Sequence, residues 1–360
     1  MKKRNSKAQE KRFPRLLLKW NEEKNKRQMP WKGERDPYKI WLSEIILQQT
    51  RVGQGLAYYH RFIETFPTIQ QLAKASDEKI YKCWEGLGYY TRCRNLIKTA
   101  RYIVKEHKGK FPSTYPEILE LAGVGPYTAA AIASFAFNQP HAVVDGNVFR
   151  VLARVFGISQ PTDSSAGKKF FTALADKLLD KDKPGIYNQA LMDFGAVICK
   201  PVNPLCNACP FNKTCSAFLN NKINELPVKE KKLIIKKRWF YFLVMEFDKK
   251  IAIQKREEKD IWQQLFTFPL IESKIETTKK QILSAAEKRK WLIKNKYETL
   301  GISPVLQQQL THQLIKSRFI HVRVRQKPTI KNNWRWVPQK TLEHYAFPKL
   351  MDDYRRLLRS

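Results

Sequence analysis

The chain has 360 residues, 43% of them hydrophobic, which is enough for two domains with real cores and excludes a disordered tail protein. Sixty-seven Lys and Arg residues against 33 Asp and Glu leave a net charge of +34 at pH 7, which favours a polyanionic partner such as nucleic acid, although a ribosome-associated protein would show the same balance. No run of 18 or more apolar residues occurs, which excludes a membrane-spanning helix, and Leu16–Leu18 is too short for a signal peptide.

Residues 15–220 carry apolar side chains at spacings of three and four, interrupted by Pro or Gly. This pattern predicts helices over 37–50, 53–65, 69–86, 89–106, 115–121, 126–137, 147–157, 165–180 and 185–199. After a basic connector, β patterns predict strands over 239–244, 251–253 and 319–324, and a final helix near 348–358. We expect a mainly α protein: an all-α domain over 1–220, a linker over 221–238, and a smaller α+β domain over 239–360.

A glycine turn joins two of these helices in the sequence Leu121–Ile132. Gly123 and Gly125 would let the backbone approach a ligand closely, and Pro126 suits the first position of the following helix. The free amides at that helix start would bind an anion such as a DNA phosphate. An ordinary helix–helix corner is the alternative, and the basic charge of the domain argues against it.

Four cysteines follow the last predicted helix of the all-α domain, with the spacing C-x6-C-x2-C-x5-C: Cys199, Cys206, Cys209 and Cys215. Thiolates at this density indicate a soft metal centre, and four of them can complete the coordination of a [4Fe–4S] cluster. Structural zinc, a disulfide framework and unrelated core cysteines are the alternatives. Because no secretory signal occurs, we expect a cytoplasmic, nucleoid-associated protein whose reducing surroundings favour a metal over disulfides.

Several motifs in the right order give the chain a resemblance to a known family. They are Met29–Trp31, Trp41–Thr50, Trp84–Tyr90, the glycine turn, Val143–Val148, Asn188–Asp193 and the four cysteines. Together they resemble the helix–hairpin–helix superfamily of endonuclease III, and within it the adenine DNA glycosylases (the MutY family), closely over residues 25–220. The resemblance implies a [4Fe–4S] cofactor and, as partner, double-stranded DNA with A:8-oxoguanine or A:G mispairs. We expect a monomer.

The resemblance also implies the chemistry, the removal of adenine by acid-assisted cleavage of its glycosidic bond. Glu44 shares a helical stripe with Ile40 and Leu47, so desolvation should raise its pKa and keep a proton available, although a glutamate that only anchors packing fits the same pattern. The position of Asp145 before an apolar stripe predicts a helix N-cap. The resemblance adds the role of an ionised carboxylate that stabilises or covalently traps the sugar cation, oriented by Asn147.

Position 127 distinguishes two kinds of glycosylase. Bifunctional relatives have a lysine at this point of the hairpin, which forms a Schiff base and leads to strand cleavage. This chain has Tyr127, which cannot form an imine. We therefore expect base removal without efficient strand cleavage.

The base must leave the duplex before it is cut, so recognition residues are expected as well. The resemblance implies that Gln49 and Tyr89 wedge near the opposite base, and that Arg27, Trp31 and Gln189 line the adenine pocket. Trp31 and Tyr89 could instead be core aromatics.

The C-terminal domain resembles the MutT-related (Nudix-like) domain that reads 8-oxoguanine in this family. Leu310, Thr311 and His312 stand where the family commonly has Phe-Ser-His, so an intercalating role at 310 is open while Thr311 and His312 keep the polar groups. No Nudix box of the form G-x5-E-x7-R-E-x2-E-E occurs, so we expect recognition rather than nucleotide hydrolysis.

Two other functions remain open at this point. One is a thymine–guanine mismatch glycosylase on the same scaffold, against which Glu44 and the C-terminal domain argue. The other is a non-catalytic iron–sulfur DNA-binding protein, which would have the cluster and the positive net charge but no catalytic acid.

Overall fold

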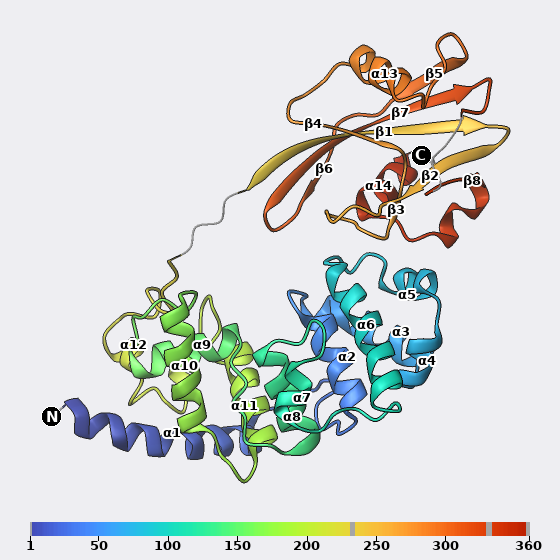
Figure 1. The fold of residues 1–360 in the computed structure, drawn as a ribbon. Coiled ribbons are helices and arrows are strands. Elements are labelled where there is room, and N and C mark those ends of the chain that lie inside the picture. Colours follow the sequence, from blue (N-terminus) through green and yellow to red (C-terminus); the bar gives the residue numbers. More distant parts are fainter. Residues whose placement is uncertain (1, 231–234, 329–332, 358–360) are drawn as a thin grey trace. The chain divides into compact units, whose positions relative to one another are not determined.

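The computed structural model describes residues 2–230, 235–328 and 333–357 (Figure 1). The chain divides by packing into two units, Met1–Lys74 with Arg94–Lys231, and Ala75–Cys93 with Lys232–Ser360. Residues 231–234 of the expected linker and residue 358 of the expected final helix lie outside the described residues. No helix in the described part of the chain is long and apolar enough to cross a membrane.

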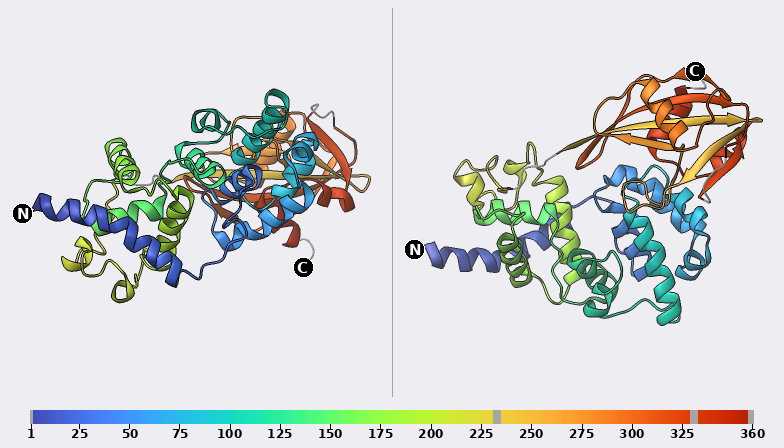
Figure 2. Two further views of the ribbon diagram at one scale, coloured as in Figure 1. Left: turned by 90° about the horizontal axis from the view of Figure 1, so that it is seen from below. Right: turned by 45° about the horizontal axis from the view of Figure 1, so that its top comes forward.

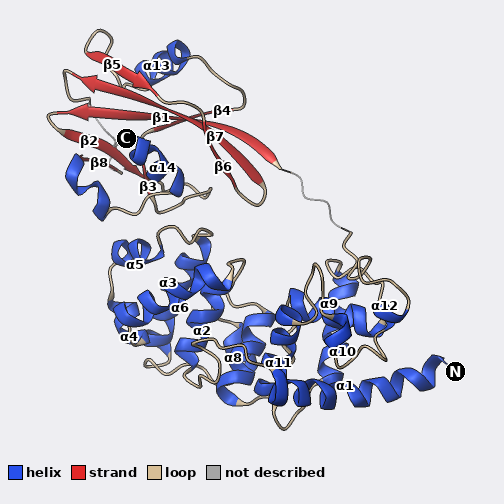
Figure 3. Ribbon diagram, turned by 180° about the vertical axis from the view of Figure 1, so that it is seen from behind, coloured by secondary structure: helices blue, strands red, loops and turns tan. Residues whose placement is uncertain are grey.

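Every regular element that the structure describes between residues 2 and 230 is a helix (Figure 3). In chain order these are α1 (Lys2–Lys24), α2 (Pro37–Leu47), α3 (Val52–Thr65), α4 (Ile69–Lys74), α5 (Asp77–Trp84), α6 (Thr91–Glu106), α7 (Tyr115–Leu119), α8 (Pro126–Phe137), α9 (Gly146–Phe156), α10 (Ser165–Leu178), α11 (Pro184–Val197), the 3₁₀ turn η1 (Cys206–Ala208) and α12 (Ser216–Leu219).

Two features of residues 2–230 differ from the sequence-based expectation. The helix predicted over 69–86 is two helices, because the Ser76 side chain accepts a hydrogen bond from the Lys79 amide and begins α5 anew. Helix α1 had no predicted range of its own. It buries Phe13, Leu17 and Trp20, and its first turns project past the helices it packs against (Figure 2).

The core of the first unit positions the residues that matter later. Val148, Val151, Leu152 and Val155 form one stripe of α9, each at most 2% exposed, and α9 packs against α11. Because side chains three and four apart share a helix face, this stripe fixes how α9 is rotated. The start of α9 is thereby held beside α11.

In the described part of the second unit, residues 235–328 and 333–357 form a mixed sheet of eight strands: β1 (Lys236–Phe247), β2 (Lys250–Lys255), β3 (Phe266–Thr267), β4 (Leu270–Ser273), β5 (Tyr297–Ile302), β6 (Leu306–Gln309), β7 (Gln313–Val324) and β8 (Trp334–Pro338). The central path runs β3-β2-β1-β7-β5, with β1 and β7 parallel in the register Phe242 opposite Phe319. Strands β4, β6 and β8 pair with β1, β7 and β2 respectively. The strands predicted over 239–244, 251–253 and 319–324 lie inside β1, β2 and β7.

Both faces of this sheet are covered, which is why β1 reads as a continuous apolar run rather than an alternating one. On one face Tyr241 and Leu243 pack with Ile282 and Ala286 of α13 (Lys279–Lys288). On the other, the Phe319 ring stacks 4.0 Å from that of Tyr354 in α14 (Lys349–Leu357). The predicted fold class, mainly α with a smaller α+β unit, is confirmed.

Candidate active site

Glu44 is a buried carboxyl near the end of α2, with 6% of the residue exposed. Asp36 caps the start of this helix by accepting from the Tyr38 amide, and Ile40 lies one turn before Glu44 and is also buried. Burial raises the pKa of Glu44 to about 7; a hydrogen bond with Tyr127 opposes the shift, and the charge of Asp145 adds to it. About half of the Glu44 carboxyls therefore hold a proton at neutral pH.

Tyr127 lies in the first turn of α8 and connects Glu44 to α11. Its hydroxyl contacts the Met192 sulfur at 3.7 Å and also hydrogen-bonds with Glu44. The interaction with Glu44 lowers the pKa of that carboxyl, as a phenol does when it donates to a carboxylate. Burial and the two nearby carboxylates raise the pKa of Tyr127 well above its ordinary value, which keeps the phenol neutral.

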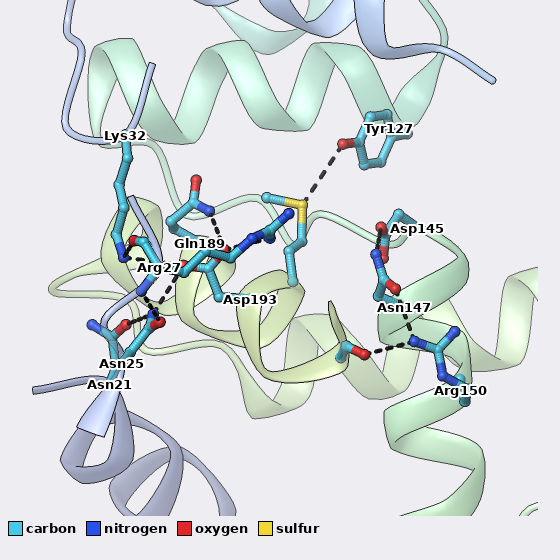
Figure 4. A network of polar contacts seen from close by, with 12 residues as sticks. Asn21, Asn25, Arg27, Lys32, Tyr127, Asp145, Asn147, Arg150, Gln189 and Asp193 are labelled. Atoms are coloured by element: carbon cyan, nitrogen blue, oxygen red, sulfur yellow. Dashed lines mark hydrogen bonds and ion pairs between the residues drawn. The ribbon is translucent and has the colours of Figure 1, made fainter. Parts of the chain in front are cut away.

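Asp145 is the N-cap of α9, as its place before an apolar stripe predicts. Its Oδ1 accepts from the Val148 amide at 2.8 Å, and its Oδ2 accepts from the Asn147 side-chain amide at 2.6 Å. Asn147 in turn accepts from Arg150 at 2.8 Å (Figure 4). Burial raises the pKa of Asp145 above its ordinary value, while the bonds from Val148 and Asn147 lower it. The charge of Asp145 in turn helps to raise the pKa of Glu44.

Arg150 joins this carboxylate to the cysteine loop. Its Nη2 also donates to the Gly195 carbonyl at 2.7 Å, and its Nε donates to the Cys199 carbonyl at 2.8 Å. A guanidinium with donors in a fixed plane holds such partners in one mutual geometry. The loop that begins at Cys199 therefore contributes to the position of Asn147 and Asp145.

The two hairpin glycines differ in whether the packing of the chain itself requires a glycine at the position. Gly123 has a φ of +80°, and a Cβ there would lie 2.7 Å from the Asn95 Cβ, so the fold itself requires it. Gly125 is the N-cap of α8 with an extended φ of −100°, and its Cβ position is open space. The chain's own packing does not require glycine at 125, which leaves room for a ligand to approach the backbone.

Two residues expected in the adenine pocket, Arg27 and Gln189, meet at the fully buried carboxylate of Asp193. Arg27 Nη1 donates to Asp193 Oδ1 at 2.7 Å, and Gln189 Nε2 donates to the same oxygen at 2.9 Å (Figure 4). Trp31 is half-buried and packs edge-on against Tyr59 at 5.4 Å. Gln189 and Met192 are three residues apart on α11, so Gln189 lies on the face that contacts Tyr127.

The expected wedge residues Gln49 and Tyr89 are both exposed and both adopt left-handed backbone conformations, with φ of +55° and +47°. Positive φ is uncommon for residues other than glycine and recurs at functional sites. Tyr89 is 46% exposed, and the guanidinium of Arg92 lies 5.4 Å from its ring centre. A core role for Tyr89 is therefore excluded.

The loop Leu310–His312 is the turn between β6 and β7 in the second unit. The Thr311 hydroxyl makes a short hydrogen bond with the Tyr89 hydroxyl, and both residues belong to this unit. Leu310 is half-buried, and His312 is exposed. The structure thus brings Tyr89 and Thr311 together at one surface.

The four cysteines of the loop line one cavity, of about 340 Å³ with its open mouth included. Burial, together with the sulfurs of Cys199, Cys215 and Cys206, raises the pKa of Cys209 to about 12, and a hydrogen bond from the Phe211 amide opposes the shift. Arg154 lines the same cavity, where its Nη1 donates to the Cys199 sulfur at 3.7 Å. Within residues 2–230, 235–328 and 333–357, no three or more His, Cys, Asp or Glu side chains form a group that could hold a single metal ion.

Comparisons with known proteins identify the family. A model of the HhH-GPD superfamily base excision DNA repair proteins matches residues 42–174, and a NUDIX domain model matches residues 240–357. An adenine DNA glycosylase from Buchnera aphidicola subsp. Baizongia pistaciae is 36% identical over 328 residues, which are 89% of this chain and 89% of that protein. The chain belongs to the adenine DNA glycosylase family. Its resemblance to these base excision repair enzymes is thereby confirmed.

Other relatives cover the helical part. The rat adenine DNA glycosylase is 45% identical over 214 residues, which are 57% of this chain and 41% of that protein. The structure of a thermostable thymine-DNA glycosylase matches with a TM-score of 0.55 and 33% identity, over 60% of this chain and 99% of that one. The adenine DNA glycosylase family and a thymine-DNA glycosylase thus share this scaffold.

Three charged residues at the site of this adenine DNA glycosylase family member had no predicted role: Arg150, Arg154 and Asp193. Arg150 follows Asn147 by three residues and Asp193 follows Gln189 by four, so helical spacing alone could have paired them. Arg154 lies in a predicted helix, but its contact with Cys199 spans 45 residues and has no sequence signal.

Proposed function

We propose that the chain removes adenine mispaired with 8-oxoguanine, and secondarily with guanine, by hydrolysing its N-glycosidic bond without cutting the strand. The buried Glu44 carboxyl, with its pKa raised to about 7 beside Tyr127 and Asp145, carries the proposal. A group that titrates near the working pH is suited to general acid catalysis. A carboxylic acid paired with a second carboxylate is the arrangement that glycoside cleavage uses.

In the proposed reaction Glu44 gives its proton to N7 of the flipped adenine. The glycosidic bond then breaks, and the base leaves with the bonding electron pair. The Asp145 carboxylate stabilises the cationic sugar, held in place by the Val148 amide and by Asn147. Water adds to C1′ and loses a proton to a carboxylate, which leaves an abasic site. Tyr127 cannot form an imine, so the strand stays intact.

DNA binding in this proposal uses several surfaces. The amides at the start of α8, beside the open position at Gly125, would bind a phosphate, and the charge of +34 would add salt-sensitive affinity. Gln49 and Tyr89 would fill the space left by the flipped base. Thr311 and His312 would contact 8-oxoguanine. We assign these roles to a glycosylase domain over 1–220 and a recognition domain over 239–360, which act as a monomer on double-stranded DNA.

We also propose that Cys199, Cys206, Cys209 and Cys215 hold a [4Fe–4S] cluster. All four face one cavity, which fits a group with four thiolate ligands. A zinc ion would need all four sulfurs about 2.3 Å from a single point. In a cluster each thiolate binds its own iron, so the sulfurs lie further apart. With all four ligands engaged the cluster would brace the loop rather than bind substrate.

The test is single-turnover excision on duplexes with A:8-oxoguanine, A:G and T:G, followed by alkali to cleave abasic sites. We expect fast alkali-dependent cleavage of the adenine strand opposite 8-oxoguanine, slower cleavage opposite guanine and none at T:G. Preferred cleavage at T:G would favour thymine–guanine mismatch repair instead. Strong borohydride trapping of the protein on DNA would contradict hydrolysis without a lyase step.

A further inference from the structure

Asp193 is a buried charge that the proposed reaction does not use. It is 0% exposed, and each of its oxygens accepts two hydrogen bonds. Oδ1 accepts from Arg27 and Gln189, and Oδ2 accepts from Asn25 at 2.9 Å and Lys32 at 3.1 Å. Four donors, two of them cations, meet at one carboxylate. A carboxylate surrounded by four donors acts only as an acceptor.

This arrangement fixes which way the Gln189 amide faces. A glutamine side chain ends in an NH₂ donor and a carbonyl acceptor, and either end could in principle face Asp193. Only the NH₂ end can bond to an ionised carboxylate, so Gln189 Nε2 faces Asp193 and Oε1 points away from it (Figure 4). No hydrogen bond to Gln189 Oε1 forms among the residues that the structure describes, and Gln189 is partly exposed. Its carbonyl is free to accept from a ligand.

Gln189 is linked to the acid through two neighbours. It shares a face of α11 with Met192, whose sulfur accepts from the Tyr127 hydroxyl, and Tyr127 in turn interacts with Glu44. In the proposed function the base that receives a proton from Glu44 also meets the Gln189 carbonyl. Adenine carries an amine donor at C6, whereas hypoxanthine and guanine carry a carbonyl acceptor there.

We propose that Asp193 is a specificity-determining residue. Its hydrogen bond from the Gln189 NH₂ group holds the Gln189 carbonyl toward the bound base, and this orientation selects a purine with an amine at C6. The proposal rests on the proposed function, because it assumes that the base occupies the pocket beside Glu44. Asp193 acts through Gln189 and touches no reacting atom.

The test compares single-turnover excision of adenine and of hypoxanthine, each opposite 8-oxoguanine, in the full-length protein. In Asp193→Asn the side chain at 193 can donate as well as accept, so the Gln189 amide can rotate and present its NH₂ to the hypoxanthine carbonyl. We expect the adenine-to-hypoxanthine rate ratio to fall about tenfold, the size of one hydrogen-bond preference. An equal loss of rate on both substrates, with the ratio unchanged, would show a merely structural role.

A double variant that exchanges the carboxylate and the amide between positions 189 and 193 should restore the rate ratio. In Gln189→Glu/Asp193→Asn the carboxylate moves to position 189, accepts from the side-chain amide introduced at position 193, and still presents an acceptor to the base beside the same two cations. We expect its rate ratio to return to within about threefold of the wild-type value. Lys32→Gln removes one cation but does not touch Gln189, and it should leave the ratio unchanged.

If Asp193→Asn does not fold, the swap is compared with Gln189→Leu, which has no acceptor and should lose the discrimination. A swap variant no more selective than Gln189→Leu would overturn the inference. Wild-type protein that excises no adenine would instead contradict the proposed function, so the two failures are distinguishable.

Discussion

Glu44 in the helical unit is buried and Asp145 is half-buried, whereas Thr311 and the exposed His312 in the second unit lie at a hairpin turn near the exposed Tyr89. Burial raises the pKa of both carboxyl groups, and a chain of bonds through Asn147 and Arg150 fixes one of them. At the hairpin, by contrast, the contact between Tyr89 and Thr311 joins two side chains that solvent reaches. Burial shifts the pKa values of the carboxyl groups that the proposed reaction uses. Exposed side chains, by contrast, remain accessible to a large ligand. Substitutions in the two regions should therefore differ in size and in kind.

The largest effect is expected from Glu44→Gln, which keeps the shape of the side chain and removes its acid. Single-turnover excision of adenine opposite 8-oxoguanine should fall by about 10³-fold or more, because general acid catalysis and leaving-group activation are lost together. Binding to the same duplex, measured by fluorescence anisotropy, should stay within a few-fold of wild type. An excision rate close to that of the wild type would show that Glu44 is not the general acid.

The stability of the same variant provides a control. The folded-state pKa of Glu44 is raised from 4.5 to about 7, so its stabilising contribution is complete below about pH 4.5 and is lost as the pH rises through 7. At pH 8 the wild type carries a buried charge that Glu44→Gln lacks, a difference of up to about 3 kcal/mol. The melting temperature of the variant at pH 8 should therefore equal or exceed that of wild type.

A smaller loss is expected from Asp145→Asn, by about 10²-fold in the same assay, because the negative charge that faces the sugar cation disappears. Asparagine is as good an N-cap as aspartate, so α9 should keep its start and the melting temperature should change little. Asp145→Ala is the matched comparison, since it removes both the charge and the cap. If Asp145→Asn lost much of its stability but kept its excision rate, Asp145 would act only as the N-cap of α9.

The smallest effects should come from the hairpin contact. Tyr89→Phe and Thr311→Ala each remove a hydroxyl and leave Glu44 untouched, so excision at A:8-oxoguanine should slow by less than about threefold. The preference for A:8-oxoguanine over A:G should fall about three- to tenfold in each, and by no more in the double variant, because one contact is lost in both. Additive losses would show that the two hydroxyls act separately.

The sequence was enough to predict most helices, the apolar surroundings of Glu44 and the glycine turn, because each depends on local spacing. Helical periodicity located α2 and the buried stripe of α9, and the position of Asp145 before that stripe predicted its cap. The break between α4 and α5 had a local signal as well, the Ser76 cap, but the apolar spacing continued across it and concealed it.

What could not be predicted depends on contacts between distant segments. Asp193 meets Arg27 and Lys32 across more than 160 residues, and Arg150 reaches the Cys199 carbonyl across 49. Strands β5 and β6 are short and exposed, and neither has the alternation that marks a half-buried strand. Both strands form by pairing with β7 through backbone hydrogen bonds. No local sequence pattern predicts this pairing.

The pH dependence of single-turnover excision at A:8-oxoguanine tests the role of Glu44 most directly. The rate should be highest between the two carboxyl pKa values and should fall tenfold per pH unit above about 7, as Glu44 loses its proton. On the acid side it should fall at a pH above the ordinary pKa of an aspartate, as Asp145 becomes protonated. A rate that stays constant or rises between pH 7 and 9 would contradict the claim that protonated Glu44 drives the departure of adenine.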